Sequence, residues 1–550
     1  MSTFLGMPPV APAGVGNLRG RESFPHAAEH EVTNQQLQHN LDFATHAIRR
    51  KRQHVVDELP DWQRLREAGS RIKREALARL PELLEQFEAR VTEHGGHVHW
   101  ARDAAEANEI VRSLVAERGE TEVLKIKSMA TQETGLNEYL EAHGIHAQET
   151  DLAELIVQLG HDTPSHILVP AIHRNRSEVR DIFLREMPGV DPELDDEPAH
   201  LAEASRRFLR ERFLRSRIAI SGANFGIAET GTLAIFESEG NGRMNLTLPE
   251  TLITVMGIEK LLPRFSDLEV FTQLLPRSST GERMNPYTSL WTGVTPGDGP
   301  QDFHLVLLDN GRTHALADQT GREALKCIRC SACLNNCPVY QHAGGHAYGS
   351  TYPGPIGAIL TPLLTGMQDA HDPNASLPYA SSLCGACFEV CPVKIDIPSI
   401  LVDLRDRKVH TVGSGAEKPV LDAAATAMSG PRRWHAAQRV AGLGGRVLAG
   451  PDKVIDRLPG LLGGWTRSRD LPAPARRTGR DWFRSAAGRA ELAAERARAD
   501  ASLHDLAGRE DNVDVTRDAD WEPRPRPAAS DAATSSGTTV PDQHTTRGDR

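Results

Sequence analysis

The sequence predicts a three-layer α/β domain with a largely parallel sheet over residues 65–311, followed by a cysteine-bearing module and a short helical C-terminal region. Two observations predict this organisation. Short apolar segments alternate with helical patterns from Val123 to Leu308, and all cysteines lie between Cys327 and Cys391. Alternating strands and helices are typical of a parallel sheet covered by helices on both faces.

The composition is that of a folded and mildly acidic protein. The chain has 550 residues, a hydrophobic fraction of 39% and a net charge of −11, from 63 Lys and Arg against 74 Asp and Glu. This length predicts roughly three to four structural units. The acidic balance gives no general attraction to phosphate backbones or anionic lipids, so it argues against nucleic-acid binding. No apolar stretch has the length of a membrane-spanning helix or a signal-peptide core, so we expect a cytoplasmic location.

Changes in composition divide the chain into five parts. The α/β domain is preceded by a Gly- and Pro-rich arm and a helical lead-in, and the cysteine module is followed by short helical segments. The final part contains helix-like Arg/Ala/Glu repeats and ends in a Pro- and Ser-rich stretch that buries little apolar surface, so we expect it to be largely disordered. The predicted boundaries are 1–64, 65–311, 312–405, 406–470 and 471–550.

Within the α/β domain the elements are assigned in chain order. A helix is expected near Arg74–Thr92, then a strand at Val123–Lys127. The next helix would be capped by Ser128 or Thr131 and end at His143, before Gly144. A strand at Ile145–Glu149 and a helix opened by an Asp151/Glu154 capping box repeat this unit.

The remaining elements follow the same alternation. A helix is expected at Leu201–Leu214, and Asp309-Asn310-Gly311 is expected to form a tight turn. The further predicted strands are His166–Val169, Arg217–Ser221, Thr232–Glu237, Leu252–Met256 and His304–Leu308. The apolar segment Pro355–Leu364 is expected to be a helix that covers the cysteine motifs.

The cysteines form two related motifs, which are the only internal repeat we find. The first contains Cys327, Cys330, Cys333 and Cys337 before Pro338, the C-x2-C-x2-C-x3-C-P pattern of bacterial two-cluster ferredoxins. The second contains Cys384, Cys387 and Cys391 before Pro392, and Ser381 stands at the position of the missing first cysteine.

In such ferredoxins the fourth cysteine of each motif binds the other cluster. This rule assigns Cys327, Cys330, Cys333 and Cys391 to a complete first cluster, and Cys337, Cys384 and Cys387 to a second cluster that lacks one sulfur ligand. The second cluster is either [3Fe-4S] or a [4Fe-4S] cluster whose fourth iron takes Ser381, water or a partner's ligand. We favour [4Fe-4S] with a non-cysteine ligand.

Other interpretations of this segment remain open. C-x2-C pairs also build zinc sites, although seven cysteines in two ferredoxin-type motifs fit crossed clusters better. The clusters would either transfer electrons or only stabilise the fold. Lys326, Arg329 and Lys394 either raise the cluster potentials or are ordinary surface charges. His346 either lies near a cluster, carries a proton or is structural.

Several segments together resemble the lactate utilization protein B family over about residues 65–470. They are KSM (127–129), AETGTLAIFE (228–237), LDNGR (308–312), CIRCSACLNNCPVY (327–340), GGHAYGSTYPGPIGAILTPLL (344–364) and LCGACFEVCPVKIDIP (383–398). The family pattern has Gly where this chain has Ser331. The resemblance implies a LUD domain, related to sugar-isomerase and CoA-transferase folds, followed by a helical ferredoxin-like module. It also implies an iron–sulfur complex that oxidises L-lactate to pyruvate with partner proteins of types A and C.

Lactate oxidation releases two electrons and two protons, whereas an iron–sulfur cluster carries one electron and no hydrogen. The clusters are therefore expected to relay electrons rather than to cleave the C–H bond. The chain has no P-loop and no Cys-Cys-Gly motif, which the resemblance places on the A-type partner. Our leading hypothesis is an electron-transfer subunit. The alternatives are a stand-alone transferase- or isomerase-like enzyme with structural clusters, and a redox scaffold.

The α/β domain also offers a candidate cleft. Lys127 and Ser128 follow a predicted strand and open a helix, where an anion would meet a cationic side chain and free N–H groups. A second turn is expected to face the same crevice, and consists of Glu229, Thr230, Gly231 and Thr232. The alternative is that Ser128 is a helix cap, Gly231 is a turn residue and the lysine is solvated.

Overall fold

The computed structural model describes residues 16–367, 369, 371–412, 417–467, 469–475 and 478–510. It divides into two compact units, Met1–Gly415 and Ala416–Arg550. The first unit contains both the α/β domain and the cysteine-bearing module. In the part of the chain that the structure describes, no helix is both long and apolar enough to cross a bilayer.

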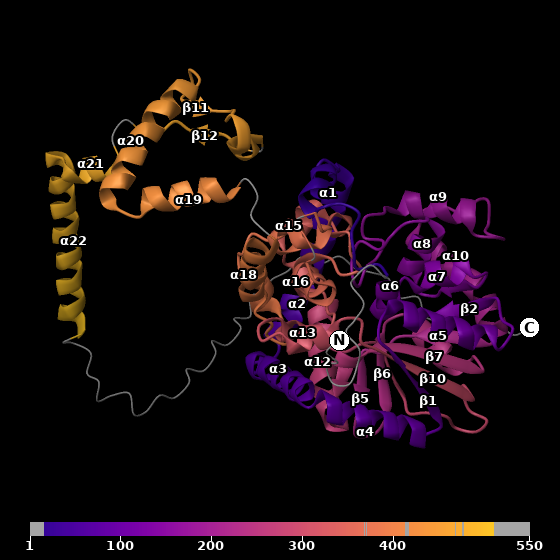
Figure 1. Ribbon diagram of the computed structural model, residues 1–550. Helices are drawn as coiled ribbons and strands as arrows, with labels where there is room; N and C mark the ends of the chain where they lie inside the picture. The colour runs from indigo at the N-terminus through magenta and orange to yellow at the C-terminus, as the bar shows by residue number, and fades with distance from the viewer. Residues whose placement is uncertain are drawn as a thin grey trace, which may run out of the picture. The chain divides into compact units, whose positions relative to one another are not determined.

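The centre of the first unit is a parallel sheet, which confirms the predicted fold class (Figure 1). All neighbouring strands run parallel. Their order across the sheet is β1 (Gly96–Ala101), β10 (Asp302–Leu308), β7 (Thr251–Gly257), β4 (Ile218–Ser221), β2 (Glu122–Lys125) and β3 (His146–Glu149). Both faces of the sheet are buried, because neighbouring residues of the inner strands enter two separate hydrophobic cores, as Leu252 and Ile253 of β7 do.

Helices and a smaller sheet complete the layers. The residues from one face of the central sheet share a core with α5 (Ala104–Ala116) and α7 (Leu136–Ala142). Those from the other face share a core with α4 (Leu80–Glu93), α8 (Leu152–Leu159), α9 (Arg176–Glu186) and α10 (Pro198–Arg215). The smaller sheet has the order β8 (Leu261–Leu262), β5 (Phe225–Ile227), β6 (Thr232–Glu237) and β9 (Tyr287–Trp291), and its β5–β6 and β6–β9 pairs are antiparallel.

The helices between residues 62 and 279 are α3 (Trp62–Ala78), α4 (Leu80–Glu93), α5 (Ala104–Ala116), α6 (Met129–Thr134), α7 (Leu136–Ala142), α8 (Leu152–Leu159), α9 (Arg176–Glu186), α10 (Pro198–Arg215), α11 (Asn241–Thr247) and α12 (Leu268–Ser279). Of these, α3 and α12 contribute buried residues to the same hydrophobic core as the cysteines. The helices of the cysteine-bearing module are α13 (Arg312–Ala317), α14 (Ala332–Asn335), α15 (Pro338–Ala343), α16 (Gly354–Thr365), α17 (Ala386–Val390) and α18 (Ile397–Arg407).

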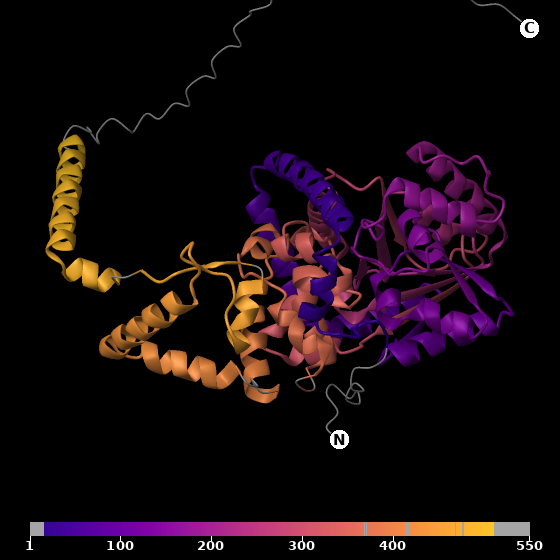
Figure 2. The ribbon, with the colours of Figure 1, turned by 90° about the horizontal axis from the view of Figure 1, so that it is seen from above.

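The N-terminal helices α1 (Phe24–Glu31) and α2 (Gln35–Asp57) belong spatially to the cysteine-bearing module. In both ribbon views these indigo helices lie among the orange helices of the module (Figures 1 and 2). Leu37 and Leu41 of α2 enter the same hydrophobic core as the buried cysteines and α16. The segment that precedes the α/β domain in sequence therefore helps to enclose the module that follows it.

Several predicted elements need correction. The helix expected near Arg74–Thr92 is divided into α3 and α4. Residues 166–169 form no strand, because His166 instead accepts the N–H groups of Leu168 and Val169 in a local turn. The helix expected to end at His143 is interrupted at Gly135, which adopts φ 69°. Asp151 makes no side-chain cap, and the Glu154 carboxylate accepts a bond from Gln132 instead.

The second unit, taken by itself, is helical and contains a short antiparallel pair of strands. Its elements are α19 (Glu417–Met428), α20 (Pro431–Leu448), β11 (Val454–Ile455), β12 (Leu471–Pro472), α21 (Gly479–Arg484) and α22 (Ala486–Glu510). The Arg/Ala/Glu stretch is therefore helical over α22, within the part that we expected to be largely disordered. Residues 511–550, where the Pro- and Ser-rich end was expected to be disordered, lie outside the described residues.

Candidate functional site

The cysteines lie in the hydrophobic core of the first unit, together with the apolar residues of α16. Most are buried, whereas Cys333 is half-buried and Cys384 is exposed. Helix α16 spans the predicted segment Pro355–Leu364, and all its residues from Gly354 to Leu364 are buried. This helix therefore contributes to excluding water from the cysteines, as expected from the sequence.

The first group of thiols combines both motifs. Cys327, Cys330 and Cys333 of the first motif line one small cavity together with Cys391 of the second. Burial raises the pKa of the Cys330 thiol, and the neighbouring Cys391 and Cys327 thiols raise it further. The apolar residues that close this cavity are Ile167, Ile328, Ile356, Pro392, Val393, Ile395 and Ile397.

The second group contains Cys337, Cys384 and Cys387. The pKa of the Cys387 thiol is raised to about 12, mainly by burial and further by the neighbouring Cys337 and Cys384 thiols. Cys333 of the first group also interacts with Cys387, so the two groups are neighbours. Ser381 is half-buried in the loop before Cys384, and its hydroxyl oxygen accepts the Leu383 N–H at 3.1 Å.

The loops around the cysteines have an unusual backbone. Arg329, Ser331, Leu383 and Lys394 all have positive φ angles, between 52° and 60°. Such conformations are uncommon for residues other than glycine, and they cluster at functional sites. They turn N–H groups toward sulfur: Arg329 N–H donates to Cys327 Sγ at 3.4 Å. Similar bonds join Tyr340 N–H to Cys337 Sγ at 3.5 Å and Ile395 N–H to Cys391 Sγ at 3.3 Å.

Cationic side chains surround the first group. Arg66 is buried and donates to the Cys391 carbonyl oxygen at 2.9 Å, and buried Arg52 donates to the Val390 carbonyl oxygen at 3.1 Å. Lys326, which the sequence left as either tuning or solvated, is fully buried, bonds to Ser70 Oγ at 3.0 Å and pairs with Glu323 at 2.6 Å. Buried cations are expensive unless an anion compensates them. Arg52 and Arg66 donate to backbone carbonyl oxygens, and their arrangement therefore fits a negatively charged group at the cysteines.

A buried ionic network connects the first group to the carboxyl edge of the central sheet. Arg312, which follows the Asp309–Gly311 turn after β10, donates to Glu133 at 2.8 Å and to Glu259 at 2.5 Å. Glu259 also accepts a bond from Arg329 at 3.2 Å, and Tyr352 donates to Glu133 at 2.5 Å. The sequence did not single out Glu133, Glu259 or Arg312 as site residues, although Arg312 stands in the family segment LDNGR, because the three side chains meet only after folding.

Several buried donors in this region have no hydrogen-bond partner among the described residues. They are Arg329 Nε and Nη1, Ser331 Oγ, Asn335 Nδ2 and Tyr348 Oη. An unpartnered buried donor costs about 1–3 kcal/mol, so such groups usually have an acceptor. The residues therefore fit a group that adds further acceptor atoms between the thiols, as the inorganic sulfides of an iron–sulfur cluster do.

The residues of the predicted cleft have different neighbours. Ser128 accepts the Thr131 N–H at 3.4 Å, which is the helix-cap role, and Lys127 lies 3.8 Å from Glu154. In the other set, Thr230 Oγ1 donates to Thr232 and Thr232 pairs with Thr292, both at 2.7 Å, while Gly231 packs against Arg90. The Glu229 carboxylate accepts the Phe265 N–H at 2.8 Å. These contacts are those of caps and turns.

A cavity of about 740 Å³ lies at the carboxyl end of β3, where α6, α8 and the segment 345–351 meet. Its wall is acidic and includes Glu138, Glu141, Glu149, Glu154, Asp162 and Glu186. Burial raises the pKa of Glu154 to about 7, although Lys127 lowers it. The acidic wall does not favour the anionic ligand that the sequence predicted for this edge of the sheet.

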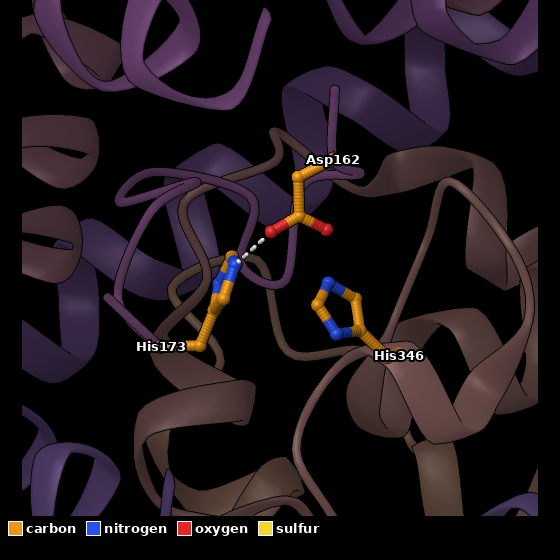
Figure 3. Close-up of side chains that lie close together, drawn as sticks. All are labelled: Asp162, His173 and His346. Atoms are coloured by element: carbon orange, nitrogen blue, oxygen red, sulfur yellow. Dashed lines mark hydrogen bonds and ion pairs between the residues drawn. The ribbon is translucent and has the colours of Figure 1, made fainter. Parts of the chain in front are cut away.

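His346 lies at this cavity, beside Asp162 and His173 (Figure 3). Asp162 accepts bonds from His173 at 2.7 Å and from Arg174 at 2.5 Å, and also from the Thr163 N–H at 2.7 Å. His346 bonds to the Thr163 carbonyl oxygen at 2.8 Å. Because the guanidinium already neutralises the carboxylate, we interpret this cluster as an ion-paired junction rather than a metal site.

Comparisons with known protein families match three successive segments of the chain. Residues 84–308 match the LUD domain, residues 323–395 the 4Fe-4S dicluster domain, and residues 407–487 the C-terminal domain of lactate utilisation protein B. Lactate utilization protein B of Oceanobacillus iheyensis is 40% identical over 472 residues, covering 84% of this chain and 96% of the relative. The chain belongs to the lactate utilization protein B family.

Two further members of the family are similar to this chain over most of their length. The Bacillus subtilis protein is 40% identical over 470 residues, covering 84% of this chain and 96% of the relative. The Geobacillus kaustophilus protein is 42% identical over 437 residues, covering 78% of this chain and 90% of the relative. The family match extends to residue 487, beyond residue 470 where the resemblance was expected to end. Among solved structures, the crystal structure of a DUF162 family protein from Deinococcus radiodurans matches with a TM-score of 0.24 and 13% sequence identity. The match covers 42% of this chain and 98% of the chain in that structure.

Proposed function

We propose that this chain is an iron–sulfur electron-transfer subunit of a cytoplasmic complex that oxidises L-lactate to pyruvate. The lactate assignment follows from the name of the relatives, lactate utilization protein B. The first [4Fe-4S] cluster would be held by Cys327, Cys330, Cys333 and Cys391. The second would be held by Cys337, Cys384 and Cys387 with a non-cysteine fourth ligand.

The observation that carries the proposal is the position of Cys391. This residue lines the same cavity as Cys327, Cys330 and Cys333, although a gap of more than fifty residues separates it from them in sequence. Crossed ligation is the arrangement of two-cluster ferredoxins, in which the last cysteine of each motif binds the other cluster. A zinc site built from each C-x2-C motif separately would not need this exchange.

The unpartnered donors also favour iron–sulfur clusters over zinc. A zinc ion bound by four thiolates brings no acceptor atom of its own, whereas a cubane brings four sulfides. Tyr348 Oη, Ser331 Oγ and Asn335 Nδ2 would then have acceptors. The buried Arg52, Arg66 and Arg329 would face the negative charge of a four-thiolate cluster.

When bound, each cluster accepts and releases one electron at a time. The chain's own residues hold the thiolates through backbone N–H bonds, exclude water with α16 and the isoleucines around the first cavity, and balance charge with buried arginines. None of these roles removes hydrogen from lactate. We therefore expect that step on a partner, and propose proteins resembling types A and C of the family's complex as partners.

Metal analysis with EPR spectroscopy tests the cluster assignment. Anaerobically purified protein is expected to contain about seven to eight irons per chain and to show two interacting paramagnetic centres on reduction. Zinc in place of iron would refute the assignment. Removing oxygen during preparation matters because Cys384 is exposed.

A reduction assay tests whether this chain receives electrons from lactate only through partner proteins. The loaded chain is mixed with L-lactate alone, and then with L-lactate and the partner proteins of types A and C. We expect the visible absorption to bleach only in the second mixture. Lactate turnover by the isolated chain with an artificial acceptor would overturn the relay role and favour a stand-alone enzyme.

A further inference from the structure

The two cysteine motifs are structural copies of one another at a constant offset of 54 positions, from Cys330 to Cys384 and from Cys333 to Cys387. Backbone bonds repeat at this offset. The N–H groups of Leu334 and Asn335 donate to the Ser331 carbonyl at 3.0 and 3.2 Å. Those of Phe388 and Glu389 donate to the Gly385 carbonyl at 2.9 and 3.2 Å. The copied fold therefore extends beyond the cysteines themselves.

The copy includes the position of the missing cysteine. In the first motif, Arg329 has φ 60° and its N–H donates to Cys327 Sγ at 3.4 Å. In the second motif, Leu383 has φ 55° and its N–H donates to Ser381 Oγ at 3.1 Å. The Ser381 oxygen thus occupies the place in its turn that the Cys327 sulfur occupies in the other.

From this correspondence we infer that the Ser381 hydroxyl oxygen is the fourth ligand of the second cluster. The inference rests on the proposed function, since it requires clusters at these cysteines. In the crossed arrangement the vacant position belongs to the first residue of the second motif, which is Ser381, and not to water or to a partner's side chain.

Ligation replaces the serine O–H bond by an Fe–O bond, and the proton is released to solvent without any change in oxidation state. A cation near the oxygen would favour the deprotonated form. Arg405 of α18 lies close by, because its Nη2 donates to the Ser381 carbonyl oxygen at 3.1 Å. The half-buried position of Ser381 also leaves its hydroxyl less hydrated than that of the exposed neighbour Ser382.

The first test compares Ser381→Ala with Ser382→Ala in the full chain, prepared without oxygen. We expect Ser381→Ala to lower the iron content from about eight to about seven per chain and to give the EPR signal of an oxidised [3Fe-4S] cluster. Ser382→Ala is expected to match the unmodified protein. An unchanged iron content and spectrum in Ser381→Ala would overturn the inference.

The second test uses Ser381→Cys, which keeps a ligand and does not depend on the stability of the alanine variant. The introduced thiol is expected to resist a maleimide reagent in iron-loaded protein and to react after iron is chelated. Reaction in the loaded protein would overturn the inference. If the unmodified protein binds no iron, the proposed function itself fails. If it binds two clusters and Ser381→Ala is unaltered, only the serine ligand fails.

Discussion

The two cysteine groups share one local fold but have different surroundings. The first group is enclosed by isoleucines and by the buried cations Arg52, Arg66 and Arg329. The second includes exposed Cys384, and the neighbouring Leu383 and Phe388 are each 38% exposed. The comparison shows that ligand spacing fixes the local turn, whereas the packing of other segments decides how accessible each group is.

This difference assigns different expected roles to the two groups. A buried anionic cluster surrounded by cations is stabilised in its reduced form, because the added electron meets positive charge. A cluster at the surface can exchange electrons with a partner over a short distance. We therefore expect electrons to pass between this chain and its partners through the second group, with the first group as the enclosed site.

The largest expected effect comes from breaking the crossed arrangement. Cys391→Ala should disrupt the first cluster and remove up to about half of the iron, because Cys391 lines the cavity of Cys327, Cys330 and Cys333 and alanine offers no ligand atom. Iron analysis and EPR spectra of the reduced protein would measure this loss.

Grouping variants by spectrum makes the test independent of any prior assignment. Cys391→Ala should leave the same residual spectrum as Cys327→Ala, and Cys337→Ala the same as Cys384→Ala. If Cys391→Ala instead resembles Cys384→Ala, each motif binds its own cluster and the crossed assignment is wrong.

The next largest effect is a loss of stability, expected when the buried ionic network beside the first cysteine group is broken. Glu259 is fully buried between Arg312 and Arg329, and although burial raises its pKa, Arg312 and the other cations hold it at about 2. Glu259→Gln leaves both guanidinium groups undercompensated, and should lower the free energy of unfolding by about 3–5 kcal/mol. Urea denaturation at pH 7 measures this loss.

The pH dependence has a definite sign. Because the folded pKa of Glu259 lies below its ordinary value of 4.5, its contribution is present above pH 4.5 and decreases as the pH falls toward 2. The difference in the free energy of unfolding between Glu259→Gln and the unmodified protein should therefore decrease as the pH falls from 4.5 toward 2. Glu67→Gln, which breaks a solvent-accessible pair with Lys394, is the control and should cost far less stability than Glu259→Gln. Equal losses in the two variants would contradict the proposed importance of the network.

A smaller effect is expected at Tyr348, whose buried hydroxyl has no partner among the described residues and lies within electrostatic reach of Cys337 and Cys333. If it donates to a cluster sulfur, Tyr348→Phe should lower the ratio of reduced to oxidised cluster at the original midpoint potential by up to about tenfold. An EPR-monitored redox titration measures this shift.

Tyr340 provides a matched control for that titration. It is also buried and near Cys337, but its hydroxyl donates to the Ser165 carbonyl oxygen at 2.8 Å. Tyr340→Phe should therefore reduce stability without moving the potential. A shift of equal size in both variants would point to a general change in packing rather than to a hydrogen bond from Tyr348.

The fold was largely predictable, because local signals specify it. Apolar runs such as those of β7 and β10 are buried on both faces and alternate with amphipathic helices, so their pattern indicates a parallel sheet. β1 was missed because its sequence, GHVHWA, contains two histidines and lacks a continuous apolar run. The false strand at 166–169 has an apolar sequence, yet its residues bury against the cysteine module instead of entering a sheet.

The candidate site was predictable only where covalent spacing specifies it. The cysteine grouping follows from motif spacing, and its ligand assignment stays a prediction until iron is measured. The surroundings do not follow from spacing. Arg66 lies on α3 and Glu259 follows β7, so their contacts with Cys391 and Arg329 depend on how the α/β domain packs against the module. No pattern in the local sequence records such long-range packing.

The smallest predicted effect exchanges one residue between the two motifs. Ser331 has φ 56°, and Gly385 at the equivalent position has φ 84°. A left-handed conformation strains a residue with a Cβ by about 1 kcal/mol, whereas glycine adopts it freely. Ser331→Gly should therefore raise the free energy of unfolding by about 1 kcal/mol, and Gly385→Ser should lower it by a similar amount. A loss of stability in Ser331→Gly would show instead that the Ser331 hydroxyl, which has no partner among the described residues, bonds to the enclosed cluster strongly enough to outweigh the backbone strain.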